Sequence, residues 1–234
     1  MSEWKTKRFW SATTVVPVDN GYTVQLDGRS VKTPAKELLV VPTEEMARAI
    51  AQEWDAQDEK IDPGTMPVTR SANAALDKVR QQKNEVADMI AAYGDSDLIC
   101  YRATEPKELV ERQAKAWDPM LDWAESVLSA PLQPVSGVMH SPQPSDALCS
   151  LKDKVHAQCA FKLTALHDLV SLSGSLIIGL AAIENQTDPE TLWGLSRVDE
   201  TWQEELWGKD DEATEHSERK KSAFLHAKRF FDLV

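Results

Sequence analysis

Alternating apolar and polar residues mark the beginning of the chain as a small antiparallel sheet. Residues 23–26, TVQL, alternate as a strand with one buried face does. An Asn-Gly pair precedes this segment and an Asp-Gly pair follows it, and both pairs favour two-residue type I′ hairpin turns. The run LLVV at 38–41 offers a fourth strand. We therefore predict a β-meander over residues 8–41.

After residue 43 the apolar residues recur at helical spacing. Met46, Ile50 and Trp54 follow one another at intervals of four, and Thr43 stands where a helix cap is expected. The same criteria predict further helices, in chain order: one over about 70–93 ended by Gly94, two with first-turn prolines at Pro106 and Pro119, one from Ser145, one within 161–183, one from Pro189 to Trp207 ended by Gly208, and one bearing Phe224, Ala227 and Phe231.

These elements define an α+β protein. Residues 1–43 form a β-rich N-terminal domain, and residues 44–234 form a larger helical domain. A stretch with four prolines, APLQPVSGVMHSPQPSD, is expected to be a loop between two helices.

The longest apolar run, residues 161–183, raises the question of a membrane span. Lys162, His167 and Asp168 interrupt its first third, and the uninterrupted part is much shorter than the roughly 20 apolar residues that a span requires. A buried core helix is the better interpretation, and we expect no stable membrane insertion. The N-terminal stretch MSEWKTKRFW lacks the apolar segment of a signal peptide, so we expect the protein to act where it is made.

The net charge of −12 argues against nucleic acid as a partner, because phosphate binding needs clustered lysine and arginine. The charge is unevenly distributed. Residues 1–43 carry six Lys and Arg against four Asp and Glu, which leaves 20 against 34 in the remainder. The three cysteines have no spacing that indicates disulfides or a zinc site, which favours a reducing compartment.

Catalytic and cofactor motifs are missing from the sequence. It contains no phosphate-binding loop, dinucleotide fingerprint, nucleophile elbow or zinc-protease motif, so we expect no cofactor. His156 and Cys159 lack a second pair of metal ligands, and we expect no metal. His167 and Asp168 are helix neighbours whose side chains point about 100° apart, so we interpret His167 as a core histidine rather than part of a catalytic pair.

The segment DETWQEELWGKDDEA, residues 199–213, combines two tryptophans with many carboxylates. Helical spacing predicts a buried face of Val198, Trp202 and Leu206 and places Trp207 at the helix edge. Two interpretations remain open: a surface that binds a partner, or a core tryptophan beside the acidic first turn of a helix. On the first interpretation the partner-binding residues are Glu200, Gln203, Trp207, Asp210, Asp211 and Glu212.

Nine ordered segments make the chain resemble the ATP synthase F1 assembly chaperones, of mitochondrial and alpha-proteobacterial type, whose client is the F1 alpha subunit. They are RFW (8–10), LDGRSVKTPA (26–35), VPT (41–43), EWDAQ (53–57), TMPVTRSAN (65–73), YGDSDLICYRA (93–103), WDPMLDWA (117–124), HDLVSLSGSL (167–176) and ETWQEELWG (200–208).

This resemblance implies a β-rich part followed by a larger helical part, no enzymatic activity, and a monomer that binds the unassembled alpha subunit before the alpha/beta hexamer forms. It also implies that the acidic segment after Trp207 matters for binding. Eukaryotic relatives are expected in the mitochondrial matrix. Because this chain begins close to the first family segment, we expect a bacterial cytoplasmic member or a shortened chain.

Two rival hypotheses remain. The first is a hydrolase that uses two carboxylates near Trp54 or Trp207, which requires a closed cleft holding both groups. The second is a membrane-associated assembly factor anchored by residues 161–183.

Overall fold

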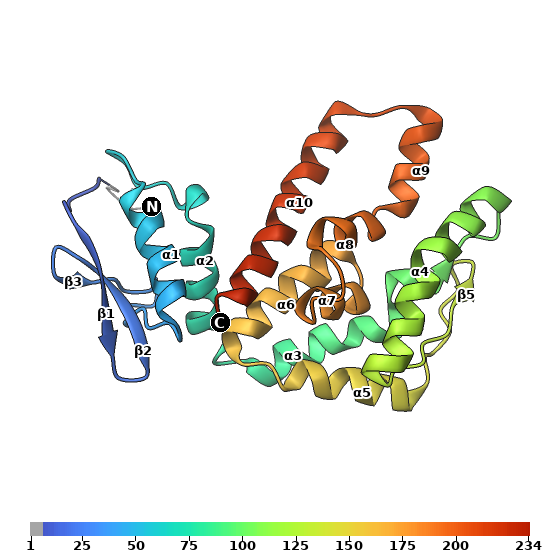
Figure 1. Cartoon of the computed structure of the whole chain (residues 1–234), viewed down its shortest axis with the longest axis horizontal. Coiled ribbons are helices and arrows are strands. Elements are labelled where there is room, and N and C mark those ends of the chain that lie inside the picture. Colours follow the sequence, from blue (N-terminus) through green and yellow to red (C-terminus); the bar gives the residue numbers. More distant parts are fainter. Residues whose placement is uncertain (1–6) are drawn as a thin grey trace. The chain divides into compact units, whose positions relative to one another are not determined.

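The computed structural model describes residues 7–234, so the first part of the N-terminal stretch considered above lies outside the described residues (Figure 1). The chain divides into two compact units. The N-terminal unit comprises Met1–Lys83 with two short later segments, Ala160–Thr164 and Arg229–Val234. The helical unit comprises Asn84–Cys159 and Ala165–Lys228.

The predicted meander is confirmed. Strands β1 (Thr13–Val18), β2 (Gly21–Leu26) and β3 (Arg29–Ser30) pair antiparallel in that order. The Asp27-Gly28 turn has both central residues at positive φ, 47° and 79°, as a type I′ turn requires. The first turn differs from the prediction: Val18 pairs with Gly21, so its central residues are Asp19 and Asn20, and of these two only Asn20 has a positive φ, 69°. The type I′ turn predicted at Asn20-Gly21 was therefore wrong, although a tight turn does join β1 to β2.

The expected fourth strand does not form a continuous ladder. Residues 38–41 make only isolated bridges, Lys32 with Leu38 and Tyr22 with Val41. The reason is a change of partner: Leu39 donates its N–H to Val31, whereas Val41 exchanges both backbone hydrogen bonds with Tyr22. Two partners within three residues leave no run long enough to count as a strand.

Helix α1 (Glu44–Asp55) begins as predicted, with the Thr43 hydroxyl accepting the N–H of Met46 at 3.2 Å. It packs against β1 and β2, and Met46 and Ile50 are fully buried. Helix α1 in turn packs against α2 (Pro67–Ala74), and the N-terminal unit continues to residue 83, whereas the sequence predicted a boundary at residue 43. The apolar face of α1 needs the sheet as its partner.

The single helix expected over 70–93 is interrupted. Helix α2 (Pro67–Ala74) passes into a π-helical turn, η2 (Ala75–Val79), followed by α3 (Lys83–Ala91) and the 3-10 turn η3 (Ala92–Ser96). Arg80 donates its N–H to the carbonyl of Ala75, the five-residue interval of a π turn. Gly94 lies within η3 rather than after the helix, and a Cβ there would meet a Leu151 side chain at 3.1 Å.

Helix α4 (Lys107–Leu128) replaces the two helices expected around Pro106 and Pro119. Pro119 lies inside it, and the buried face continues past the proline from Trp117 to Leu128. The proline-rich stretch is mostly loop, as predicted. It contributes a two-residue strand, β5 (Val135–Ser136), parallel to β4 (Tyr101–Arg102).

The apolar run 161–183 is two helices, not one. After α5 (Ser145–His156) come α6 (Ala160–Ser173) and α7 (Leu176–Ile183), separated by Gly174 at a φ of 74° and by the Ser175 cap. Every residue of α7 is buried, which confirms a core helix. Among the described residues, no helix has the length and apolar character needed to span a membrane.

The C-terminal helices are α8 (Pro189–Leu195), α9 (Val198–Trp207) and α10 (Asp211–Asp232). The expected helix from Pro189 to Trp207 is thus broken at residues 196–197, although the Asp188 cap and the Gly208 stop are both as predicted. Phe224 and Ala227 are buried, and Phe231 is half-buried. Together these elements confirm the α+β class.

Candidate functional site

The end of α9 exposes two large apolar side chains. Trp207 is 79% exposed and Leu206 is 56% exposed. Val198 is buried as predicted and Trp202 is half-buried, but the prediction that Leu206 is buried was wrong. Helix α4 contributes Arg112, which lies over the Trp202 ring at 5.3 Å and pairs with Glu205 at 2.9 Å. Leu206 and Trp207 extend beyond these contacts into solvent.

The acidic residues after Trp207 form the start of α10. The Asp210 carboxylate accepts the N–H of Ala213 at 2.7 Å and so caps the helix. Asp211 and Glu212 occupy the first turn, where negative charge is favoured by the helix dipole, and both are exposed. The structure therefore combines parts of both interpretations: the acidic turn is a helix terminus, but Trp207 is not a core residue.

Glu200 and Gln203 line different hollows on either side of α9. Glu200 accepts a hydrogen bond from Arg197 at 2.7 Å and borders a hollow of about 420 Å³ that also includes Lys220. Gln203 borders a second hollow together with Trp202. The six predicted partner-binding residues therefore lie on α9, in the connection after it and in the first turn of α10, but they do not converge on a single pocket.

The second hollow, which we call the α4–α9 groove, has a volume of about 340 Å³. Its lining comes from β4 and the residues after it, from α4, from α9 and from the loop after β5: Tyr101, Arg102, Ala103, Thr104, Glu105, Leu109, Gln113, Gly137, Val138, Asp199, Trp202 and Gln203. The loop places Val138 and the following Met139 in solvent, 92% and 79% exposed. Apolar side chains thus occur both at the groove and at the end of α9.

Gln113 links the elements that line the α4–α9 groove through hydrogen bonds. It is buried, donates to the Asp199 carboxylate at 2.7 Å and accepts the N–H of Ala103 at 2.8 Å. These bonds join α4, α9 and the residues after β4. Gln113 was not predicted as a site residue, because a polar residue within an amphipathic helix carries no sign of being buried.

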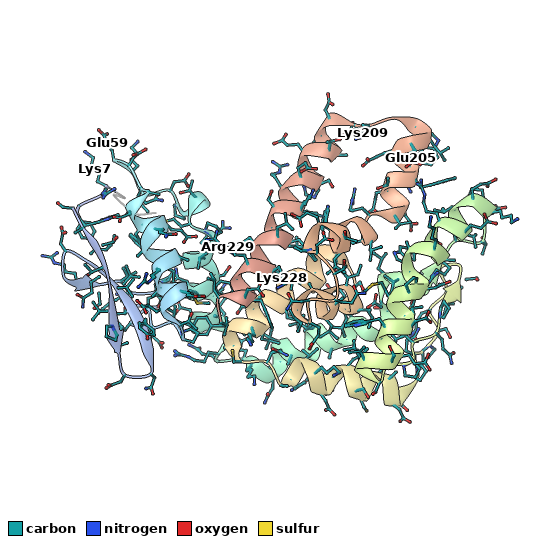
Figure 2. All side chains as sticks on the ribbon, viewed as in Figure 1. Lys7, Glu59, Glu205, Lys209, Lys228 and Arg229 are labelled. Carbon is teal, nitrogen blue, oxygen red and sulfur yellow. The ribbon has the colours of Figure 1, made fainter. Side chains whose placement is uncertain are left out.

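The cations at the groove are already engaged. Arg102 pairs with Asp118 at 2.8 Å and lies over the Trp117 ring. Arg112 likewise pairs with Glu205 and lies over the Trp202 ring. Of the exposed acids at the end of α9 and the start of α10, Glu205 pairs with Arg112, whereas Asp210, Asp211 and Glu212 form no ion pair with any residue that the structure describes; Figure 2 labels Glu205 and Lys209. The surface therefore combines exposed apolar groups with excess negative charge.

The carboxylates near Trp54 serve the fold. Glu53 accepts the backbone N–H groups of Val68 and Thr69 at 2.7 and 2.8 Å, and Asp62 accepts that of Gly64 at 2.8 Å. The pocket beside Trp54 has no carboxylate among its described lining residues. This pocket therefore lacks the pair of carboxylates that the hydrolase hypothesis requires near Trp54, and the carboxylates next to Trp207, Asp210, Asp211 and Glu212, are exposed.

His167 and His156 each contact an aspartate. His167 and Asp168 do contact each other, Nδ1 to Oδ1 at 2.9 Å, and His167 is only half-buried. The interpretation as a core histidine was wrong, because side-chain rotation brings neighbours on an exposed helix face together. The hydrogen bond that His167 donates to the Asp168 carboxylate raises the pKa of His167. His156 bonds to Asp88 rather than pairing with Cys159, and residues 7–234 contain no cluster of three potential metal ligands.

Comparison with known proteins gives a consistent result. A family model described as ATP12 chaperone protein matches residues 7–125. Protein atp12, mitochondrial, of Schizosaccharomyces pombe is 25% identical over 223 residues, covering 89% of this chain and 76% of that protein. Atp12 from Paracoccus denitrificans, a crystal structure, is 47% identical with a TM-score of 0.96 and 99% coverage of both chains. The Atu1473 protein from Agrobacterium tumefaciens is 40% identical with a TM-score of 0.93, covering 97% of this chain and 85% of that one.

Proposed function

The chain belongs to the ATP12 chaperone protein family, and from this premise we propose that it is an ATP-independent assembly chaperone of ATP synthase whose client is the unassembled F1 alpha subunit. It holds the alpha subunit, prevents its aggregation and releases it when the alpha/beta hexamer forms. The choice of client follows from the resemblance of the nine sequence segments. We place the protein in the bacterial cytoplasm, where its client is made, and expect it to act as a monomer.

The observation that supports this proposal is the exposed end of α9. An indole ring that is 79% exposed, next to a leucine that is 56% exposed, is unfavourable in water unless a partner covers it. Tryptophan is also among the side chains that contribute most to protein interfaces. The carboxylates of Asp210, Asp211 and Glu212 follow directly, and such charges select a partner with a basic surface.

Holding a client in this way requires no nucleotide. A protein that binds an aggregation-prone surface lowers the free concentration of that surface by mass action. The sequence has no phosphate-binding loop, which agrees with a passive mechanism.

Light scattering tests the proposal. Denatured F1 alpha subunit is diluted into buffer with the full chain at equimolar amount and without ATP. We expect the chain to suppress light scattering by the alpha subunit. The F1 beta subunit, diluted in the same way, is expected to aggregate as much with the chain as without it. Suppression that depends on added ATP, or that is equal for both subunits, would overturn the mechanism or the choice of client.

A further inference from the structure

A separate pocket lies in the N-terminal unit beside Trp54, and we call it the Trp54 pocket. Its volume is about 420 Å³, within the range of roughly 300–1,000 Å³ that is typical of ligand sites. Most of its wall is apolar and comes from Pro34, Trp54, Ile61, Pro63 and Met66. Nothing in the proposed function uses this pocket.

The wall of the pocket is firmly built. The Trp54 ring packs edge-on against Trp10 with centroids 5.2 Å apart, and Met66 is 2% exposed. Thr33 is fixed by its backbone, which donates to Glu37 and accepts from Lys36. The pocket is therefore shaped by packed elements rather than by a loose surface loop.

Three residues of the lining have buried polar atoms without partners. The Thr33 hydroxyl, the Trp54 indole N–H and the Asn73 amide oxygen form no hydrogen bond with any described residue. Thr33 as a whole is only 4% exposed. Because these three atoms are shielded from solvent, they do not offer hydrogen bonds at the pocket surface, and the wall that a ligand would meet is mainly apolar.

The rim of the pocket is cationic. Lys32 and Arg70 are exposed, line the pocket and form no ion pair with any residue that the structure describes. The nearby acids are engaged: Glu37 pairs with Arg80, and Asp77 accepts the N–H of Ala35 at 3.0 Å. In a chain with a net charge of −12, two free cations at the edge of an apolar pocket select for an anionic group.

We propose that the Trp54 pocket binds an extended polypeptide segment in which a large apolar side chain stands next to a carboxylate. The apolar side chain fills the pocket and the carboxylate pairs with Lys32 and Arg70. This rests on the proposed function only in that a chaperone's ligand is a polypeptide.

The charge preference of this pocket is opposite to that of the acidic end of α9. The Trp54 pocket selects an acidic, apolar segment, whereas the end of α9 and the start of α10 select a basic surface. The two sites therefore recognise different parts of the client and do not compete for the same segment.

Fluorescence anisotropy with the full chain tests the proposal. The probe is a short fluorescein-labelled peptide with a Phe-Leu pair flanked by aspartates, and the matched peptides replace the aspartates by lysine or the Phe-Leu pair by alanine. We expect the aspartate peptide to bind at least about tenfold more tightly than either matched peptide, about 1.4 kcal/mol. The double variant Lys32→Glu, Arg70→Glu is expected to lose that preference.

The double variant Arg29→Glu, Lys36→Glu is the matched control. It makes the same change in charge at exposed positions of the same unit that do not line the pocket. Equal affinity of the aspartate and lysine peptides, or an equal loss in both double variants, would overturn the proposal. Binding of decanoate at the rim without binding of the aspartate peptide would also overturn it, because the pocket would then be a site for small amphiphiles.

The proposed function and this inference fail in different ways. If the aspartate peptide binds at the Trp54 pocket but the alpha subunit is not held, the pocket stands and the client is wrong. If charge reversal at the rim leaves peptide affinity unchanged while the alpha subunit is still held, the client stands and the pocket proposal is wrong.

Discussion

The carboxylate of Asp97 accepts the backbone N–H of Ile177 at 3.0 Å, and this bond ties the segment before β4 to the first turn of α7. The same carboxylate accepts the N–H of Ile99 at 3.2 Å. Asp97 is completely buried, and this burial raises its pKa to about 6, although hydrogen bonds from Ser175 and from Ile177 and Ile99 oppose the shift.

This burial predicts a specific pH dependence. The folded-state pKa of Asp97 lies above that of an unfolded aspartate, so its contribution to stability is greatest below about pH 4 and is lost as the pH rises through about 6. We expect the difference in the free energy of unfolding between the wild type and Asp97→Asn to fall by about 3 kcal/mol as the pH rises from about 4 to about 6. Urea denaturation of both proteins at several pH values measures it, and a difference that stays constant would contradict the prediction.

Two other carboxylates, Asp88 and Asp188, have lowered pKa values. Hydrogen bonds from Lys152 and His156 lower the pKa of Asp88, and those from Thr191 lower the pKa of Asp188. Their contributions have the opposite sign and are lost only as the pH falls below about 4.

Reversing the charge at the start of α10 is expected to weaken binding of the alpha subunit. The double variant Asp211→Lys, Glu212→Lys places cations opposite a basic client surface. It also opposes the helix dipole, so we expect a loss of stability of about 1–2 kcal/mol that leaves the protein folded. Pull-down at low salt measures binding of the alpha subunit. Added salt is expected to reduce the difference in binding between the variant and the wild type, because exposed charges are screened beyond about 8–10 Å.

The control for this variant is Asp122→Lys, Glu125→Lys on the exposed face of α4, which makes the same change in charge away from α9 and α10. We expect it to bind the alpha subunit as the wild type does. Equal loss in both variants would show that net charge alone governs the association.

Trp207→Ala is expected to reduce alpha-subunit binding by at least about thirtyfold, the effect of an interface hot spot of about 2 kcal/mol. Its stability should change by less than about 0.5 kcal/mol, because the ring is exposed. Trp202→Ala is the comparison: this ring is half-buried and lies against Arg112, so its loss should lower the melting temperature. Unchanged binding in Trp207→Ala, measured by titration calorimetry, would refute the interface at the end of α9.

Thr33→Val is expected to increase the free energy of unfolding by about 1 kcal/mol, since it removes a buried hydroxyl that has no partner in the described structure. Thr23→Val is the matched variant in the same unit. Thr23 is also buried, but its hydroxyl donates to the Leu39 carbonyl at 2.7 Å, so its loss should cost about 1 kcal/mol. Destabilisation of equal size in both variants, measured by denaturant titration, would show that the Thr33 hydroxyl has a partner.

Local chemistry made several features predictable from the sequence alone. The Asp-Gly turn, the Thr43 and Asp188 caps and the Gly208 stop depend on the conformations that one or two residues allow, so they appear where they were expected. Alternation of apolar residues is equally local, and it was enough to identify the β-meander and the α+β class. The composition likewise indicated the negative charge that characterises the proposed binding surface.

Tertiary structure decided which side chains are covered. Leu206 has the spacing of a buried residue, but α4 engages Trp202 and Glu205 and leaves the last turn of α9 exposed. Helical periodicity repeats along a helix whether or not a neighbour is present, so it cannot show where the neighbour ends. Helical periodicity also could not predict the Trp54 pocket, because its lining joins residues 32–34 to residues 54–73. Nor could it predict that Gln113 is buried, because α9 and the residues after β4 supply its partners.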